Sequence, residues 1–157
     1  MVNLIPCTIR YEFIQKFNVS AQRAFVWCTD YRPDDMKLMK EENATRRVQR
    51  IANEVLILFD TFVDKERKGI EKQKLVCIYP KRLTWTSTHL TGPNKYSQFI
   101  YEVTALAEGK SQLKFTALSL DYENRNKEDI ERRSKAVKKG DAEKWKLLAE
   151  EMEKDTC

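Results

Sequence analysis

The chain has 157 residues, of which 41% are hydrophobic and 34% are charged, and its formal net charge is +5. This length and composition are typical of one folded domain and exclude an intrinsically disordered chain. No apolar run approaches the roughly eighteen residues that a membrane-spanning helix needs, and the short run at residues 4–7 lacks the basic flank of a signal peptide. We therefore expect a single domain spanning residues 1–157, located in the cytoplasm.

The cysteines and the single histidine limit the chemistry of the chain. Cys7, Cys28, Cys77 and Cys157 are widely spaced and form no CxxC pair, and His89 is the only histidine. A Cys/His metal site would need ligands from four distant segments, and cytoplasmic thiols stay reduced. The sequence also lacks GxSxG, HExxH and a glycine-rich phosphate loop. We expect free thiols, no metal, no cofactor and no catalytic constellation.

The first predicted elements are one strand and two short helices. Apolar and charged residues alternate over Thr8–Phe17, which predicts a half-buried strand. Ser20 is a suitable N-cap for a short buried helix over Ala21–Thr29. Pro33, followed by two aspartates, is suited to the first turn of a second helix over Pro33–Lys40.

From Ala44 to Tyr122 the sequence predicts six strands in three hairpins. Their ranges are Arg46–Ile51, Val55–Val63, Ile70–Tyr79, Leu83–His89, Tyr96–Leu106 and Ser111–Tyr122. In the last hairpin, a three-residue turn with Gly109 in a left-handed conformation keeps one face apolar throughout. This register pairs Ala105 with Leu113, Val103 with Phe115, and Tyr101 with Ala117.

The hairpin around Pro80 is predicted by the same reasoning to have a three-residue loop, Pro80-Lys81-Arg82. One face then carries Leu75, Cys77, Tyr79, Leu83 and Trp85, and the other carries Lys72, Lys74, Thr84, Thr86 and Thr88. Towards one end the first face becomes polar, with Glu71, Gln73, Ser87 and His89. Such a change is typical of the mouth of a pocket, and equally of a sheet rim that meets water.

The last predicted element is a long amphipathic helix over about residues 126–155. Its apolar stripe is strong near Trp145, Leu148 and Met152 but weakens around Ser134 and Asp141. Gly140 costs about 1 kcal/mol relative to alanine inside a helix and indicates a bend or a close approach to the sheet. The weak stripe predicts either a helix that leaves the core unsealed or one that leans into solvent.

The positive charge is concentrated in residues 65–82. This segment holds Lys65, Arg67, Lys68, Lys72, Lys74, Lys81 and Arg82 against Glu66 and Glu71. A local basic patch on a strand pair is consistent with a solvated sheet face or with a phosphate-binding surface.

The order strand, two short helices, six antiparallel strands and one long helix resembles the START and birch-pollen-allergen superfamily, which has the helix-grip fold. Ser20–Trp27 (SAQRAFVW) resembles the first-helix signature of that superfamily, and Tyr79–Trp85 (YPKRLTW) resembles its proline-basic-leucine-aromatic hairpin. The terminal helix resembles its gripping helix. The resemblance implies an α+β fold in which a seven-stranded curved antiparallel sheet wraps around the long helix.

The resemblance also implies a cavity between sheet and helix for lipids, sterols, quinones, polyketides or plant hormones. The expected cavity walls are Tyr11, Phe13, Leu75, Trp85, Tyr101, Phe115, Ala117 and Trp145, and the expected polar mouth is Glu71, Gln73, Ser87 and His89. The same aromatic residues would equally form an ordinary core with no space for a ligand.

Three functions are consistent with this sequence. The first is binding or transport of a hydrophobic small molecule of the lipid, quinone or polyketide class. The second is an interaction module whose basic strand pair contacts RNA, the ribosome or an acidic protein. The third is an enzyme of the polyketide cyclase or dehydratase type, in which His89 or Glu71 would act on a bound carbonyl; Glu102 is expected to point away from the apolar face. Fold-level likeness cannot choose among them, and the oligomeric state stays open.

Overall fold

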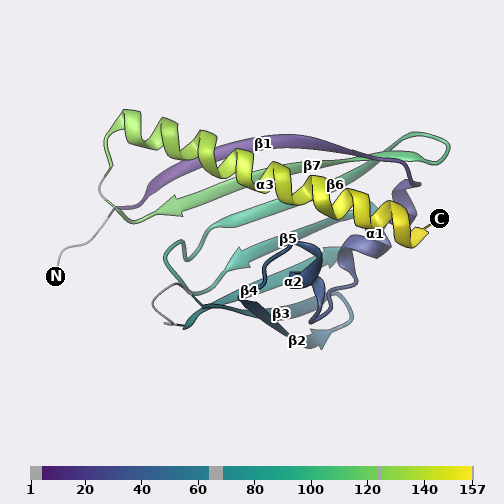
Figure 1. Ribbon diagram of the computed structural model, residues 1–157, viewed down its shortest axis with the longest axis horizontal. Coiled ribbons are helices and arrows are strands. Elements are labelled where there is room, and N and C mark those ends of the chain that lie inside the picture. The colour runs from purple at the N-terminus through teal and green to yellow at the C-terminus, as the bar shows by residue number, and fades with distance from the viewer. Residues whose placement is uncertain (1–4, 64–68, 124, 157) are drawn as a thin grey trace.

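The computed structural model describes residues 5–63, 69–123 and 125–156, which form a curved seven-stranded antiparallel sheet and a long C-terminal helix (Figure 1). The strands are β1 (Cys7–Phe17), β2 (Ala44–Ala52), β3 (Val55–Val63), β4 (Gly69–Tyr79), β5 (Thr84–His89), β6 (Gln98–Ala107) and β7 (Lys110–Asp121). The helices are α1 (Ala21–Thr29), α2 (Asp35–Leu38) and α3 (Lys127–Thr156), with a 3-10 turn η1 at Pro80–Arg82.

The strand order β1-β7-β6-β5-β4-β3-β2 brings the first strand of the chain beside the last. Strands β2 to β7 follow one another as neighbours, and β1 completes the sheet beside β7. Figure 1 shows α3 crossing the sheet near this edge, and its main strand contact is β1. The predicted α+β architecture, a curved antiparallel sheet that wraps around one long helix, is confirmed.

The two short helices differ in how well the sequence predicts them. Helix α1 has its predicted bounds, and the Ser20 side chain accepts a hydrogen bond from the Arg23 amide at 3.3 Å. Helix α2 is shorter than the predicted Pro33–Lys40. It ends early because Lys40 has a left-handed φ of 56° and the Glu41 amide bonds the Met36 carbonyl, which is a left-handed helix cap.

The β6–β7 hairpin differs from its predicted register by two residues. Tyr101 pairs with Phe115 and Val103 with Leu113, and an irregularity lies between Ala105 and Ala107. The expected three-residue turn was wrong because this irregularity places the extra residue inside the strand, not in the turn. A shift of two residues preserves the faces, so the apolar inner face survives.

The β4–β5 hairpin differs from its predicted register by one residue. Tyr79 pairs with Thr84 and Ile78 with Trp85. The three-residue loop was wrong because Leu83, with a left-handed φ of 48°, follows η1 as a fourth loop residue. Since side chains alternate along a strand, a shift of one residue exchanges the two faces of β4 relative to β5.

This exchange changes which β4 side chains lie on the concave face of the sheet. Lys72, Lys74, Val76 and Ile78 share the inner face with Trp85, Ser87 and His89 of β5. The outer face instead carries Glu71, Gln73, Leu75, Cys77 and Tyr79. The basic patch expected on the sheet surface is therefore not one surface: two of its lysines face inward, and residues 65, 67 and 68 lie outside the described residues.

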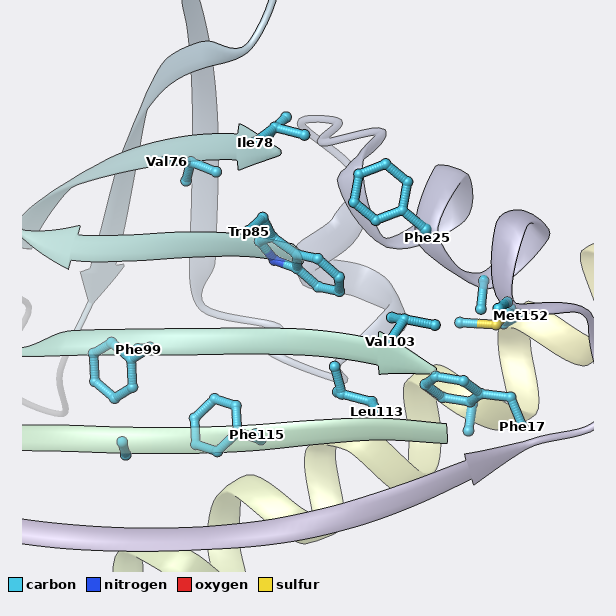
Figure 2. Close-up of a cluster of buried hydrophobic side chains, with 14 of the residues drawn as sticks. Phe17, Phe25, Val76, Ile78, Trp85, Phe99, Val103, Leu113, Phe115 and Met152 are labelled. Atoms are coloured by element: carbon cyan, nitrogen blue, oxygen red, sulfur yellow. The ribbon is translucent and has the colours of Figure 1, made fainter. Parts of the chain in front are cut away.

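The apolar core is concentrated where α1 and the C-terminal part of α3 meet the sheet. Figure 2 shows Phe25 of α1 and Met152 of α3 approaching the sheet side chains around Trp85. We call this region the packed end and define it by Phe17, Phe25, Trp85, Val103, Leu113 and Met152, which are at most 4% exposed. The strongly apolar C-terminal half of the predicted helix stripe therefore packs on the sheet and closes this end of the core.

Two further predictions concern the whole chain. Cys7, Cys28 and Cys77 are free thiols, and Cys157 lies outside the described residues. None of the described helices is both long enough and apolar enough to cross a membrane.

Candidate ligand cavity

A cavity of about 700 Å³ lies between the concave face of the sheet, α2 and the middle of α3. Its volume is within the range of about 300–1,000 Å³ that is typical of small-molecule sites. Side chains from α3 that line it include Val137, Asp141, Trp145 and Leu148. The weak half of the helix stripe therefore covers a cavity, as one of the two alternatives predicted.

Aromatic rings form one wall of the cavity. Tyr101 of β6 makes an edge contact with Phe115 of β7, with ring centroids 5.2 Å apart, and lies 5.8 Å from the ring of Trp145 on α3. Phe99 lies 5.9 Å from Phe115 on the same face. Such a wall offers a large flat apolar surface to a ligand.

The structure brings six of the predicted site residues to the cavity. They are Tyr11, Tyr101, Phe115 and Trp145 among the predicted walls, and Ser87 and His89 at the predicted mouth. Their contact with a ligand stays a prediction.

Three of the other predicted wall residues lie on the inner side of the sheet but do not line the cavity. Phe13 stacks on Phe115 with centroids 4.8 Å apart. Trp85 is 1% exposed within the packed end, where it stacks on Tyr101. Ala117 is fully buried between β1 and β6. Phe13 and Trp85 therefore pack against the aromatic rings that line the cavity.

Glu71, Gln73 and Leu75 were placed on the wrong face. The one-residue change in the β4–β5 register turns them to the outer side of the sheet, where the Gln73 amide donates to Glu71 at 3.1 Å. They are absent from the cavity lining, so the predicted four-residue mouth is reduced to Ser87 and His89.

A charged cluster that sequence reasoning missed lies opposite the aromatic wall. Asp60 of β3 is 0% exposed and accepts two hydrogen bonds from Arg46, at 2.7 and 2.9 Å. Lys74 Nζ lies 2.9 Å from the same carboxylate, and Arg46 also contacts Asp35 at 3.3 Å. Burial alone would raise the pKa of Asp60, but the two cations outweigh it and hold that pKa below its ordinary value.

His89 is buried and electrically neutral in this environment. Burial and the positive charge of Lys74 lower its pKa to about 4. Its Nδ1 lies 3.1 Å from Oδ1 of Asn94, so Nδ1 carries the hydrogen and donates it. The other ring nitrogen, Nε2, is then left with a lone pair that can accept a proton or a hydrogen bond.

Tyr11 and Asp141 connect β1 to α3 beside the cavity. The Tyr11 hydroxyl donates a short hydrogen bond to the Asp141 carboxylate. Burial raises the pKa of Asp141, and burial together with the Asp141 charge raises the pKa of Tyr11, so the phenol stays protonated. Asp141, which interrupts the apolar stripe of the helix, thus forms a hydrogen bond between the helix and the sheet.

The described residues include no group of three or more His, Cys, Asp or Glu side chains positioned to hold a metal ion.

No protein-family profile and no curated protein matches this sequence. Solved structures do match. The Zhui aromatase/cyclase of Streptomyces sp. R1128 superposes with a TM-score of 0.78 at 10% identity, covering 96% of this chain and 97% of that one. A Staphylococcus aureus protein of unknown function gives 0.78 at 13% identity, covering 98% and 99%.

A third match is norcoclaurine synthase from Thalictrum flavum, in complex with dopamine and hydroxybenzaldehyde. It gives a TM-score of 0.70 at 12% identity and covers 96% of this chain and 87% of that one. The chain has the helix-grip fold. At these identities the likeness extends to the fold, whereas the chemistry of this helix-grip cavity has to be argued from its own side chains.

One signal in the sequence could have revealed the charged cluster. Asp60 interrupts an apolar strand on the same face as Leu56 and Leu58, and Arg46 lies opposite it on β2. A charged pair on the inner face of two neighbouring strands indicates a polar interior. No comparable signal exists for Lys72 and Lys74, because their orientation depends on the β4–β5 loop.

Proposed function

We propose that this protein binds a hydrophobic or amphipathic small molecule, of the lipid, quinone or polyketide class, in the helix-grip cavity. The observation that carries the proposal is the cavity of about 700 Å³, bounded by Tyr101, Phe115 and Trp145. A cavity of this size beneath an otherwise well-packed helix loses packing energy, so a bound ligand accounts for it better than chance does. The presence of dopamine and hydroxybenzaldehyde in the structure of norcoclaurine synthase supports the use of the fold for small aromatic molecules. We place this activity in the cytoplasm.

The test is binding of N-phenylnaphthylamine, an uncharged dye whose fluorescence rises in apolar surroundings. Ser119 of β7 lines the cavity, whereas Lys114 on the same strand is half exposed on the opposite face. In Ser119→Trp the new ring occupies cavity space, and we expect dye affinity to fall at least about tenfold, or 1.4 kcal/mol. Lys114→Trp is the matched control and should bind normally.

Thermal unfolding of both tryptophan variants establishes that they are folded. Unchanged dye affinity in a folded Ser119→Trp protein would show that the dye binds elsewhere and would contradict the proposal.

A second candidate, acid–base chemistry on a bound carbonyl compound, is favoured by one specific observation. His89 is neutral, and among the described residues its Nε2 has no hydrogen-bond partner, so it can accept a proton, while its pKa of about 4 makes it a weak base. Proton abstraction next to a carbonyl can be followed as deuterium exchange into β-tetralone, a bicyclic aromatic ketone, by nuclear magnetic resonance. Wild-type protein should accelerate the exchange, and His89→Gln should abolish the acceleration while N-phenylnaphthylamine still binds. Normal exchange in that variant would exclude His89 as the base.

A further inference from the structure

We propose that Lys72 binds the anionic end of the ligand, so that the natural ligand is an aromatic or amphipathic carboxylate. This inference rests on the proposed function, because it concerns the same cavity.

Most cations that line the inner half of the cavity already have a carboxylate partner. Arg46 and Lys74 share Asp60, and Arg46 also contacts Asp35. Lys144 of α3 lies 3.0 Å from Glu41. Among the described residues, Lys72 has no carboxylate within ion-pair distance, although its side chain lines the cavity. Within the described residues, one positive charge in the cavity wall therefore has no carboxylate in ion-pair contact.

That Lys72 forms no ion pair with a carboxylate of the described strands has a definite structural cause. Lys72 lies directly opposite Asp60 in the β3–β4 register, where a cross-strand pair would ordinarily form. Both oxygens of Asp60 are instead occupied, one by Arg46 and the other by Arg46 and Lys74 together. The nearest carboxylate on the sheet is thus already shared by two other cations.

The surroundings of Lys72 hold its ammonium group at the cavity. Its Nζ lies 5.4 Å from the centroid of the Phe62 ring, which also lines the cavity. A Cβ added at Gly92 would lie 3.4 Å from Lys72 Cγ, so the backbone of Gly92, with a φ of 98°, passes close to the stem of the side chain. The aliphatic part of the Lys72 side chain is thus held in place by Gly92. Its ammonium group remains available to bind an anion.

The electrostatic surroundings favour an anion at this position. Burial lowers the pKa of Lys72, and the nearby charges of Lys74 and Lys144 lower it further; the more weakly acting carboxylates of Asp60 and Asp141 raise it but do not reverse the shift. A partly buried cation beside other cations is stabilised by any anion that enters, because the anion supplies the missing pair. The aromatic wall on the other side of the cavity supplies an apolar surface. A flat ring that carries a carboxylate can therefore pack against this wall and pair with the ammonium group of Lys72.

The test is a displacement experiment with N-phenylnaphthylamine as the reporter. Two competitors of the same shape are compared: naphthoate, which carries a carboxylate, and naphthamide, which is neutral. Because both displace one dye from one cavity, the ratio of their affinities measures the contribution of the charge. Wild-type protein should prefer naphthoate by about tenfold, the size of one charge-assisted hydrogen bond.

Three variants identify the responsible group. Lys72→Met should remove the preference for naphthoate and leave naphthamide affinity within about twofold of wild type. Lys72→Arg keeps the charge and should keep the preference. Lys138→Met removes an exposed lysine of α3 and should change neither competitor.

The outcomes separate this inference from the proposed function. If the reporter fails to bind wild-type protein, the proposed function itself is wrong. If the reporter binds but naphthoate has no advantage, or keeps its advantage in Lys72→Met, only the anion site is wrong. Should Lys72→Met fail to fold, Lys72→Gln is the second neutral variant, and a preference for naphthoate that survives in it would overturn the inference.

Discussion

The packed end and the cavity end of this protein are built on the same strands, yet their inner faces have opposite character. Along β3 the inner residues change from Leu56 and Leu58 to Asp60, along β4 from Ile78 and Val76 to Lys74 and Lys72, and along β5 from Trp85 to Ser87 and His89. Helix α3 follows the same gradient from Met152 back to Asp141. Three neighbouring strands and their covering helix thus become polar in the same direction.

The difference teaches that one half of the sheet is built around an apolar core and the other half around a cavity with polar and charged side chains. The packed end is covered by α1 and the C-terminal turns of α3, and Figure 2 shows its labelled side chains pointing toward one another from the sheet and from these helices. The cavity end holds buried charges, which seldom stabilise a fold more than apolar residues would. Stability alone therefore does not explain its polar groups, which agrees with the ligand binding proposed above.

The largest effect is expected from breaking the buried ion cluster. Asp60→Asn removes the charge that Arg46 and Lys74 share. Leaving two buried cations without their partner should lower the free energy of unfolding by about 3–5 kcal/mol, measured by urea denaturation. A loss below about 1 kcal/mol would show that water screens the cluster and that the cavity end is not a buried environment.

A matched pair of leucines compares the two ends directly. Leu113 is 0% exposed at the packed end, whereas Leu148 lines the cavity. Leu113→Ala should cost about 3 kcal/mol in the free energy of unfolding, and Leu148→Ala about 1 kcal/mol, because part of its surface already faces empty space. Equal costs would mean that the two ends are equally packed, and would remove the distinction.

The pH dependence of stability should report the cavity end through His89. Its pKa is lowered from 6.5 to about 4 in the folded protein, so the unfolded chain takes up a proton first as the pH falls. Stability should therefore fall by about 2 kcal/mol between about pH 7 and about pH 5 from this group. Urea denaturation of His89→Gln at the two pH values should show a smaller loss, and an identical loss would place the titration on other groups.

The smallest effect concerns the helix above the cavity. Gly140 lies within α3, and a Cβ added there meets no heavy atom within 4 Å. Gly140→Ala should raise the free energy of unfolding by about 1 kcal/mol and the melting temperature by a few degrees. The close approach of Gly140 to the sheet that the sequence suggested was wrong, because the space around it is open. A destabilised variant would show that the glycine instead permits a bend in α3.

The sequence predicted the fold well because the fold depends on repeated patterns. Alternation in the strands, the N-cap at Ser20 and the helix stripe around Met152 each depend on several residues that agree. The cavity wall at Tyr101 and Phe115 was predicted for the same reason, since a two-residue register shift leaves the faces unchanged.

The charged side of the cavity was not predictable in the same way. Pattern reasoning places lysines in solvent, so Lys72 and Lys74 were assigned to the outer face and Leu75 to the inner one. A single backbone conformation, the left-handed Leu83, decides the opposite arrangement. Leucine carries no turn signal for such a conformation, so this reversal lies beyond what a single sequence shows.

The pairing of β1 with β7 has a consequence for how the protein is made. The first strand can complete the sheet only after Ala117 and its neighbours on β7 have been synthesised, and α3 emerges later still. Until then the concave face, with Phe99 and Phe115, has no cover. Closure over such a long separation is slow, so the nascent sheet passes through a stage in which its concave face is incompletely covered and prone to aggregation.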